Sequence, residues 1–346
     1  MAWWQKQRSG NNSQNIQAAV ANFGLGYEDV LAVVSNYVES KLSALSQVAF
    51  EEARDRVEEI TVNYLKTIQE SCPQDLENAR DPGVQSALLD AQSAYAKVGD
   101  PDLGQVLVEM LVKRTGATDR NVQQLALTEA IVATGKLSYR HVQLITALFL
   151  TLAVTFGTPA SLDGLYERIS RNLSPFLIGL VASDADIQYL ADTGATRIET
   201  ISSRKIPSVI RETYPGLYCR GIDKVAFPAI AKYEGGPLIM PCIRDSSLLQ
   251  VAAVTERHLE RMVFELGLEE QKNELLSMLK ANPVPDDQIE RELIDRVPGM
   301  AEYFRLWNGT VLESSVPSIV GIAIAHANLK KTLGADFTAD LDIWIS

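Results

Sequence analysis

The sequence predicts a mainly α-helical protein: a long spine helix with helical hairpins, followed by a smaller α+β lobe. Three observations lead to this fold class. A run without glycine or proline extends from Tyr27 to Glu70, and its apolar residues recur in steps of three and four. Shorter amphipathic segments with short connections follow it. Beyond residue 183, turn-forming residues become denser and short alternating segments occur, which favours strands as well as helices.

The chain of 346 residues divides into three predicted segments. Residues 1–26 form a polar flexible leader, because residues 10–18 are rich in turn-forming side chains and have no helical period. Residues 27–183 form a helical bundle domain. Residues 184–346 form an α+β C-terminal lobe, with a soft boundary near Ser183.

The Tyr27–Glu70 segment would span roughly 60 Å as one helix, at about 1.5 Å per residue. Its apolar stripe takes mostly four-residue steps and lacks the alternation of three and four that a coiled-coil seam requires. The helical hairpins downstream offer packing partners within the same chain. We therefore interpret this segment as an intramolecular spine, with one end left over for a partner.

Two later helices have clear start signals. Asp81-Pro82 and Asp100-Pro101 each place an aspartate where it accepts hydrogen bonds from free amides and a proline at the first helical position. The last predicted helix, Pro317 to Leu333, carries small residues such as Gly321 and Ala325 that allow another element to approach closely.

Short strands are predicted in the C-terminal lobe. The segments Arg197–Ile201 and Leu248–Ala252 suit strands by composition. At the end of the chain, Leu341–Ile345 alternates apolar and polar residues, so we expect a strand docked into the C-terminal lobe.

Composition narrows the function classes. The formal net charge of −12 argues against general nucleic-acid binding, because such binding requires cations that neutralise phosphates. Three widely spaced cysteines without a CxxC pair favour a reduced, cytoplasmic location. The apolar run Val142–Phe156 is interrupted by polar residues and is shorter than the ~20 residues of a membrane span, so we expect a buried helix.

Catalytic motifs are not recognisable in this sequence. It has no phosphate-binding P-loop, no dinucleotide-binding glycine motif, no G-x-S-x-G elbow and no H-E-x-x-H metal motif. We therefore predict no cofactor and no metal site. A Cys–His pair drawn from Cys219, Cys242 and His258 is the enzymatic alternative, and small buried apolar cysteines are the simpler interpretation.

One weak basic cluster stands out in an otherwise acidic chain. With Tyr214 and Tyr218 nearby, it would bind an anion, a nucleotide or an acidic partner. The alternative is scattered surface charge that pairs locally with Glu199, Glu212 and Asp223. The residues of the cluster are Arg197, Arg204, Lys205, Arg211, Arg220 and Lys224.

The leader carries a recognisable segment, Gly10-Asn11-Asn12-Ser13-Gln14-Asn15-Ile16-Gln17-Ala18. It resembles a G-[D/N]-N-S-x-N-I-Q-A segment near the start of many bacterial proteins, several of which belong to conflict or antiviral defence systems. Together with the helical body and apolar end, it makes the chain similar to a bacterial protein family with no assigned activity. Ala19 and Val20 replace the two glycines that family members often have. The candidate interaction residues in the leader are Trp3, Trp4, Asn12, Asn15 and Gln17.

These features lead to a primary hypothesis and two alternatives. The primary hypothesis is a non-enzymatic protein-interaction, sensor or regulatory protein that binds a protein partner or itself. The resemblance implies bacterial antiviral defence. The alternatives are a membrane-perturbing toxic effector and a small-molecule or nucleotide-binding enzyme with a pocket between Tyr214 and Ser247.

Overall fold

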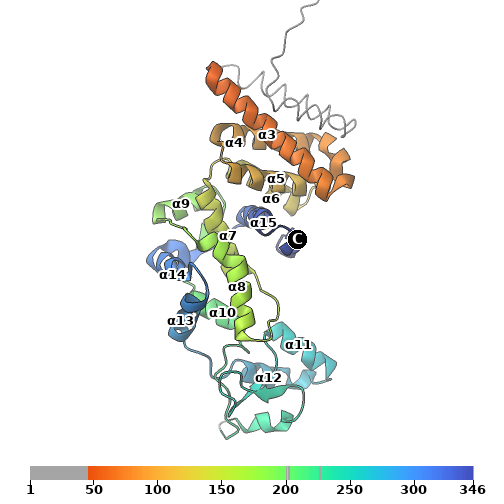
Figure 1. Cartoon of the computed structure of the whole chain (residues 1–346). Helices are drawn as coiled ribbons and strands as arrows, with labels where there is room; N and C mark the ends of the chain where they lie inside the picture. Colours follow the sequence, from red (N-terminus) through yellow and green to blue (C-terminus); the bar gives the residue numbers. More distant parts are fainter. Residues whose placement is uncertain (1–45, 200, 202, 226, 346) are drawn as a thin grey trace, which may run out of the picture. The chain divides into compact units, whose positions relative to one another are not determined.

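The computed structural model describes residues 46–199, 201, 203–225 and 227–345, and these residues are mainly helical (Figure 1). They form two compact units, each assembled from separate stretches of the chain. Unit 1 contains the described residues up to Thr146, Gln188–Arg197 and those from Pro317 onward, and unit 2 contains Ala147–Ile187 and Ile198–Val316. The sequence analysis placed a single boundary near Ser183, whereas the chain passes between these units four times.

Unit 1 is built from helices. Those that lie wholly within it are α3 (Gln47–Ser71), α4 (Pro82–Val98), α5 (Pro101–Gly116), α6 (Val122–Thr134) and α15 (Ile319–Leu333), with the 3₁₀ turns η1 (Pro73–Arg80), η5 (Gly334–Asp336) and η6 (Leu341–Ile343). Boundaries between the units fall inside α7 (Tyr139–Ala153), α9 (Asp184–Asp192), β1 (Thr196–Ile198) and β4 (Ser315–Pro317). Strands β1 and β4 pair in a two-stranded sheet.

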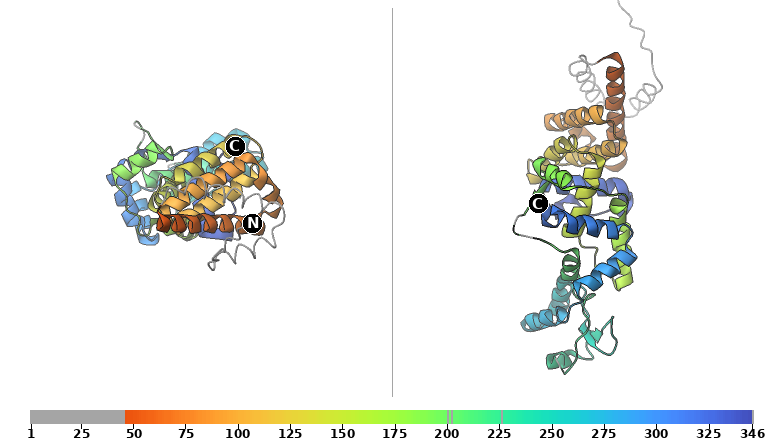
Figure 2. Two further views of the ribbon diagram at one scale, coloured as in Figure 1. Left: turned by 90° about the horizontal axis from the view of Figure 1, so that it is seen from above. Right: turned by 90° about the vertical axis from the view of Figure 1, so that its left-hand side faces the viewer.

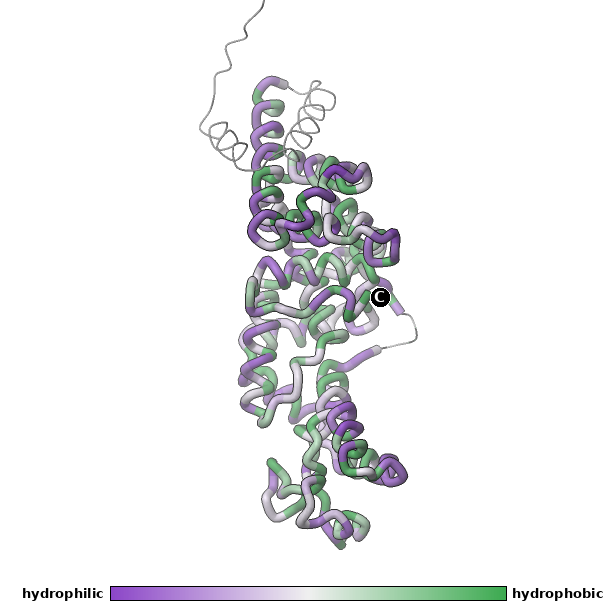
Figure 3. The backbone as a smooth tube through the Cα atoms, turned by 90° about the vertical axis from the view of Figure 1, so that its right-hand side faces the viewer, coloured by the Kyte–Doolittle hydropathy of each residue, from purple (hydrophilic) through white to green (hydrophobic). Residues whose placement is uncertain are grey.

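Helix α3 is the described part of the predicted spine. It packs against α4 and α5 (Figure 1, Figure 2), and its buried stripe includes Val57, Ile60 and Tyr64. Figure 3 shows that hydrophilic and hydrophobic residues alternate from turn to turn along the helices. The stripe from Ala53 onward therefore packs within the chain, as the periodicity predicts.

The prediction of one continuous helix from Tyr27 to Glu70 is wrong at its N-terminal side. Ser46 has φ −61° and ψ 155°, which is an extended conformation, and α3 begins at Gln47. Ser46 occupies the position just before the helix, although its side chain makes no capping hydrogen bond. Residues 27–45 of the predicted spine, and the leader with Trp3, Trp4, Asn12, Asn15 and Gln17, lie outside the described residues.

The two Asp-Pro helix starts are confirmed. The Asp81 carboxylate accepts hydrogen bonds from the amides of Gly83 and Val84 at 2.9 and 3.1 Å, and Pro82 opens α4. Asp100 does the same for Asp102 and Leu103 at 2.9 and 3.3 Å, and Pro101 opens α5. The starts of α4 and α5 are thus fixed by local side-chain caps.

Helix α15 completes the core of unit 1 by packing against α5 and α6. At its start, the Ser318 hydroxyl accepts a hydrogen bond from the Gly321 amide at 3.1 Å, and the Ser318 amide donates to the Ala195 carbonyl at 3.0 Å. Gly321 lies so close to this carbonyl that an added Cβ would be 2.0 Å from the Ala195 oxygen. The small residue at this position is required by contact with the backbone.

The predicted closing strand is wrong. Leu341–Ile343 is a 3₁₀ turn, in which Leu341 is buried and Ile343 is 67% exposed. The Asp340 carboxylate accepts a hydrogen bond from the Asp342 amide at 3.1 Å, a local bond that competes with strand pairing. This end of the chain belongs to unit 1, where Lys113 binds Asp340, and not to a C-terminal lobe.

Unit 2 combines helices with one small sheet. Its helices are α8 (Leu162–Leu177), α10 (Ile206–Thr213), α11 (Glu256–Glu265), α12 (Lys272–Leu279), α13 (Asp286–Arg296) and α14 (Met300–Gly309), with the 3₁₀ turns η2 (Pro228–Tyr233), η3 (Glu269–Gln271) and η4 (Val311–Ser314). Helix α8 packs against α13 and α14. Strands β2 (Ile239–Pro241) and β3 (Leu249–Val251) are antiparallel, with Met240 opposite Gln250.

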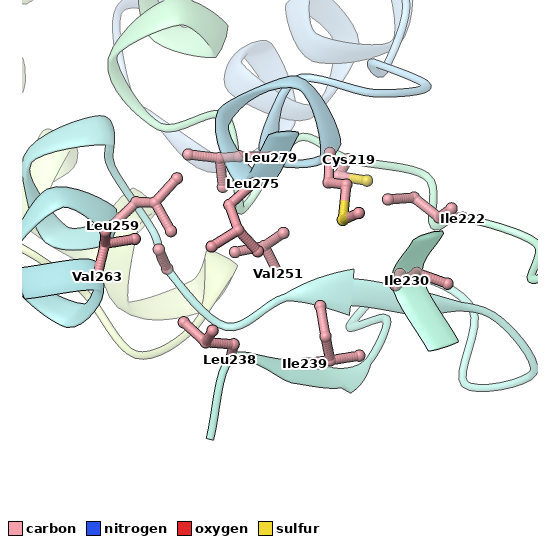
Figure 4. Packing of buried hydrophobic residues seen from close by; sticks show 12 residues of the cluster. Cys219, Ile222, Ile230, Leu238, Ile239, Val251, Leu259, Val263, Leu275 and Leu279 are labelled. Carbon is pink, nitrogen blue, oxygen red and sulfur yellow. The ribbon is translucent and has the colours of Figure 1, made fainter. Parts of the chain in front are cut away.

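The region between residues 219 and 279 has a core of its own (Figure 4). Val251 and Ile239 from the hairpin, Leu259 from α11 and Leu275 from α12 pack together there. Of the predicted strands, Arg197–Ile201 corresponds to β1 and Leu248–Ala252 to β3. Strand β2 was not predicted, because its sequence ends in a proline that cannot donate to a ladder.

The contact at Gly321 yields a stability prediction. Replacing Gly321 with alanine places a methyl group against the Ala195 carbonyl, so the free energy of unfolding should fall by about 1–3 kcal/mol. Urea unfolding followed by circular dichroism measures this change. Gly309→Ala is the matched control, because an added Cβ there meets nothing within 4 Å. Equal stability of the two variants would contradict the close approach.

Candidate functional site

Two members of the predicted basic cluster form ion pairs in unit 2. Arg204 pairs with Glu199 at 2.7 Å and Lys224 with Glu234 at 2.5 Å. Each ion pair joins a cation to a different acid, so their charges are neutralised locally. This arrangement matches the alternative of local pairing, and Glu199 is one of the acids that the sequence named for it.

The other members of the cluster are also dispersed. Arg211 forms an ion pair with Asp286 and donates to the Val284 carbonyl at 3.2 Å. Arg220 donates to the Asn282 side chain at 2.9 Å. Lys205 is exposed just before α10, and Arg197 is exposed on β1 in unit 1.

A pocket of about 330 Å³ lies next to Arg211 in unit 2. Arg211, Tyr218 and Lys280 are among its lining residues. Its size is at the lower end of the range for small-molecule sites. A pocket therefore exists near the loop-rich segment where the sequence analysis placed one. Of the cations on its wall, Arg211 bonds Asp286 and Lys280 forms an ion pair with Glu256 at 2.5 Å.

The strongest polar assembly of unit 2 is centred on Glu292 of α13. Arg244 donates two hydrogen bonds to its carboxylate, at 2.7 and 2.9 Å, and a third to the Leu217 carbonyl at 3.1 Å. The Tyr166 hydroxyl of α8 donates to Glu292 at 2.6 Å, and Tyr218 donates to Tyr166 at 3.1 Å. We call Tyr166, Tyr218, Arg244 and Glu292 the tyrosine–glutamate network.

Electrostatics keep this network ionised at its centre. Burial raises the pKa of Glu292, but hydrogen bonds from Arg244, Tyr166 and Gln288 outweigh it and hold the pKa at about 2. Burial, the neighbouring Tyr218 and Glu292 raise the pKa of Tyr166, so its hydroxyl remains a donor at neutral pH. The Arg244 guanidinium also lies 5.3 Å from the centre of the Tyr218 ring.

Sequence reasoning missed this network for a physical reason. Its four members come from α8, two loop segments and α13, and the directly bonded Tyr166 and Glu292 are 126 positions apart in the chain. The spacing of neighbouring residues in the sequence does not indicate contacts between residues so far apart. The partial signal was Tyr218, which the sequence analysis noted beside the basic cluster.

The cysteines near this region bind the main chain. The Cys219 thiol donates to the Ala281 carbonyl at 3.3 Å and accepts from the Gly221 amide at 3.2 Å. Burial raises the pKa of Cys219, so its thiol is protonated at neutral pH and a weak nucleophile. His258 accepts a hydrogen bond from the Val254 amide at 3.2 Å. Among the described residues, neither buried thiol is bonded to a histidine.

The predicted apolar run Val142–Phe156 forms most of α7 and part of the segment after it. Val142, Leu148 and Phe149 are each at most 1% exposed. No helix in the described part of the chain has the length and apolar character needed to cross a membrane.

Helix α6 presents an unusual surface in unit 1. Its buried face carries Ala126, Leu127 and Ile131. On its outer face, three large apolar side chains remain exposed along the helix: Val122, Leu125 and Val132, at 49%, 48% and 38%. We call these three residues the α6 stripe. A helix that is apolar on all sides is normally buried on all sides.

The fold thus defines a mainly helical protein of two compact units with small antiparallel sheets. A protein-family model with the description ":-like" matches residues 24–345, and the chain belongs to this family. No curated protein and no solved structure matches the chain. The family description names no reaction, ligand or partner.

The tyrosine–glutamate network yields a pH prediction. A carboxylate whose pKa is about 2 in the folded protein and 4.5 when unfolded contributes stability above pH 4.5 and loses it as the pH falls toward 2. Because Glu292 is partly exposed, we expect about 1 kcal/mol of this contribution to be lost between pH 5 and pH 3. Urea unfolding at these two pH values measures it.

The matched variant is Glu292→Gln, which keeps the shape of the side chain and removes its titration. It should be less stable than the wild type at pH 5 and should lose less free energy of unfolding between pH 5 and pH 3. Identical pH dependence in both proteins would show that Glu292 is not the group responsible.

Proposed function

We propose that the protein is a non-enzymatic interaction protein that works as a sensor or regulator through self-association. The single observation that supports this best is the α6 stripe. Val122, Leu125 and Val132 lie at helical positions that share one face, and only Glu129 interrupts them with a charge. Covering such a face removes apolar surface from water, which is the main driving force of association.

A second copy of this chain is the partner that the stripe suits. A self-complementary contact places the same surface on both molecules, and an apolar stripe is self-complementary without requiring paired charges. The net charge of −12 would oppose association elsewhere on the surface, so a face with one carboxylate is favoured. Three exposed side chains are fewer than the ~20 residues of a standard interface, so the association should be weak and concentration-dependent.

The proposed setting is antiviral defence in a bacterial cytoplasm. The resemblance of residues 10–18 to the leader segment of defence proteins supports this setting. These residues lie outside the described structure, so the support comes from sequence alone. In this setting, self-association of a sensor would convert a change in concentration or ligand into an active assembly.

Light scattering coupled to size-exclusion chromatography tests the proposal. The wild-type protein should show an average mass that rises with concentration above 38.0 kDa. Leu125→Asp should remain a monomer at the same concentrations, because a charge at the stripe would have to be desolvated in the contact. A wild-type protein that stays monomeric at all concentrations would refute self-association through α6.

A matched control separates this effect from general surface change. Val181→Asp introduces the same charge at an apolar residue of unit 2 that is 65% exposed, and it should associate as the wild type does. Phage plating on bacteria that produce each protein tests the biological setting. Protection by the wild type and Val181→Asp, and its loss with Leu125→Asp, would support a defence role that depends on the stripe.

The second candidate is a small-molecule or nucleotide-binding enzyme, and the pocket beside Arg211 favours it. Thermal unfolding with a panel of nucleotides should then show a higher melting temperature with at least one of them. Lys280→Ala should reduce that increase, because Lys280 lines the pocket. If no nucleotide changes the melting temperature of the wild type, the nucleotide version of this candidate is wrong.

A further inference from the structure

A second pocket, of about 540 Å³, lies entirely within unit 1. Its wall is formed by the end of α3 and start of η1, the last turns of α5, the start of α6, helix α15 and the segment after it. Val112 and Phe337 provide apolar surface, and the remaining wall is rich in charged groups. This pocket is independent of both the α6 stripe and the pocket beside Arg211.

The charges on its wall are unbalanced. Four carboxylates line it, against the two ammonium groups of Lys113 and Lys330. The carboxylates are those of Asp75, Glu109, Asp340 and Asp342. The pocket is therefore acidic, and an anionic ligand would meet repulsion there.

The positive charge of Lys113 is already engaged. Its ammonium group donates to both oxygens of Asp340, at 3.0 and 3.1 Å. These contacts and the Asp342 amide lower the pKa of Asp340, although burial acts in the opposite direction. Lys113 therefore holds the segment after α15 in place, and its charge is largely neutralised by Asp340.

His326 adds no positive charge to the pocket. Its ring is held against the Ala339 carbonyl at 3.0 Å and lies 5.1 Å from the centre of the Phe337 ring. Burial lowers the pKa of His326, so the imidazole is neutral at physiological pH. The ring forms part of a rigid wall.

Two carboxylates of the wall, those of Glu109 and Asp75, lack a hydrogen-bond or ion-pair partner among the described residues. Glu109 projects from α5 and is half-buried. Burial raises its pKa, and Lys330 opposes this shift from a greater distance than an ion pair. A carboxylate removed from water without a hydrogen-bond donor is costly, and a bound cation would relieve that cost.

The carboxylates do not converge as metal ligands. No group of three or more histidine, cysteine, aspartate or glutamate side chains in the described residues is placed to hold a metal ion. An extended cation suits separate carboxylates better, since an amine or guanidinium group can bond one of them while a carbon chain covers the apolar wall.

We propose that this pocket binds a small organic cation, with an ammonium or guanidinium group on Glu109 and an aliphatic part against Val112 and Phe337. A second positive group would bind Asp75, whose carboxylate has no hydrogen bond or ion pair with any described residue, or Asp342, whose carboxylate accepts a hydrogen bond from Gln123. A diamine, or an alkyl chain with an amine at one end and a guanidine at the other, has this chemistry.

Isothermal titration calorimetry on the full chain tests the proposal, with putrescine and agmatine as probes and glutarate and butanediol as anionic and neutral counterparts. At least one cation should bind with a stoichiometry of one and raise the melting temperature, whereas the counterparts should not bind. Glutarate binding as tightly as the cations, or no saturable cation binding at millimolar concentrations, would overturn the proposal.

Three variants identify the site. Glu109→Gln keeps the side-chain volume and should weaken cation binding at least tenfold, whereas Lys330→Met should strengthen it by removing a competing charge. Glu51→Gln removes the same charge from an exposed position of unit 1 outside both the pocket and α6, and it should bind as the wild type does. Equal weakening by Glu109→Gln and Glu51→Gln would show that the cation responds only to the overall acidity of the protein.

Discussion

The arrangement of unit 2 depends on one partly buried, ionised carboxylate. Glu292 cannot leave water unless donors satisfy it, and Arg244, Tyr166 and Gln288 supply them. These donors come from α8, α13 and the segment that follows β2, so a single charge requires three parts of the unit to meet. Hydrophobic packing alone would allow many registers between these parts, and paired hydrogen bonds with fixed geometry allow few.

Local chemistry explains which parts of the fold could be predicted from the sequence. Asp81 and Asp100 cap helices with bonds that reach only three residues along the chain, and the stripe of α3 follows from periodicity alone. The error at Ser46 shows the limit of the same signals, because an apolar period does not reveal a single residue in an extended conformation. At Asp340, a local hydrogen bond overrode an alternating pattern that is typical of a strand.

The candidate sites were less predictable because they are made by contacts between distant residues. Glu109 and Asp75 share a pocket wall with Asp342, although more than 200 positions separate them from it. The basic residues were grouped because they are close in the sequence, but in the structure Arg204, Arg211 and Lys224 form ion pairs with different acids. The α6 stripe was missed for another reason: a helix apolar on all sides reads as buried, and only the structure shows which face is left uncovered.

The discontinuity of unit 1 has a consequence for synthesis of the chain. Helices α3 to α6 are made first, but α15 and the turns after it, which complete their core, are made last. Between Thr146 and Pro317 lie 170 residues, so unit 1 cannot close until they have been made. During that interval its apolar surfaces are open, and a fragment cut near residue 183 would lack the helix that completes its core.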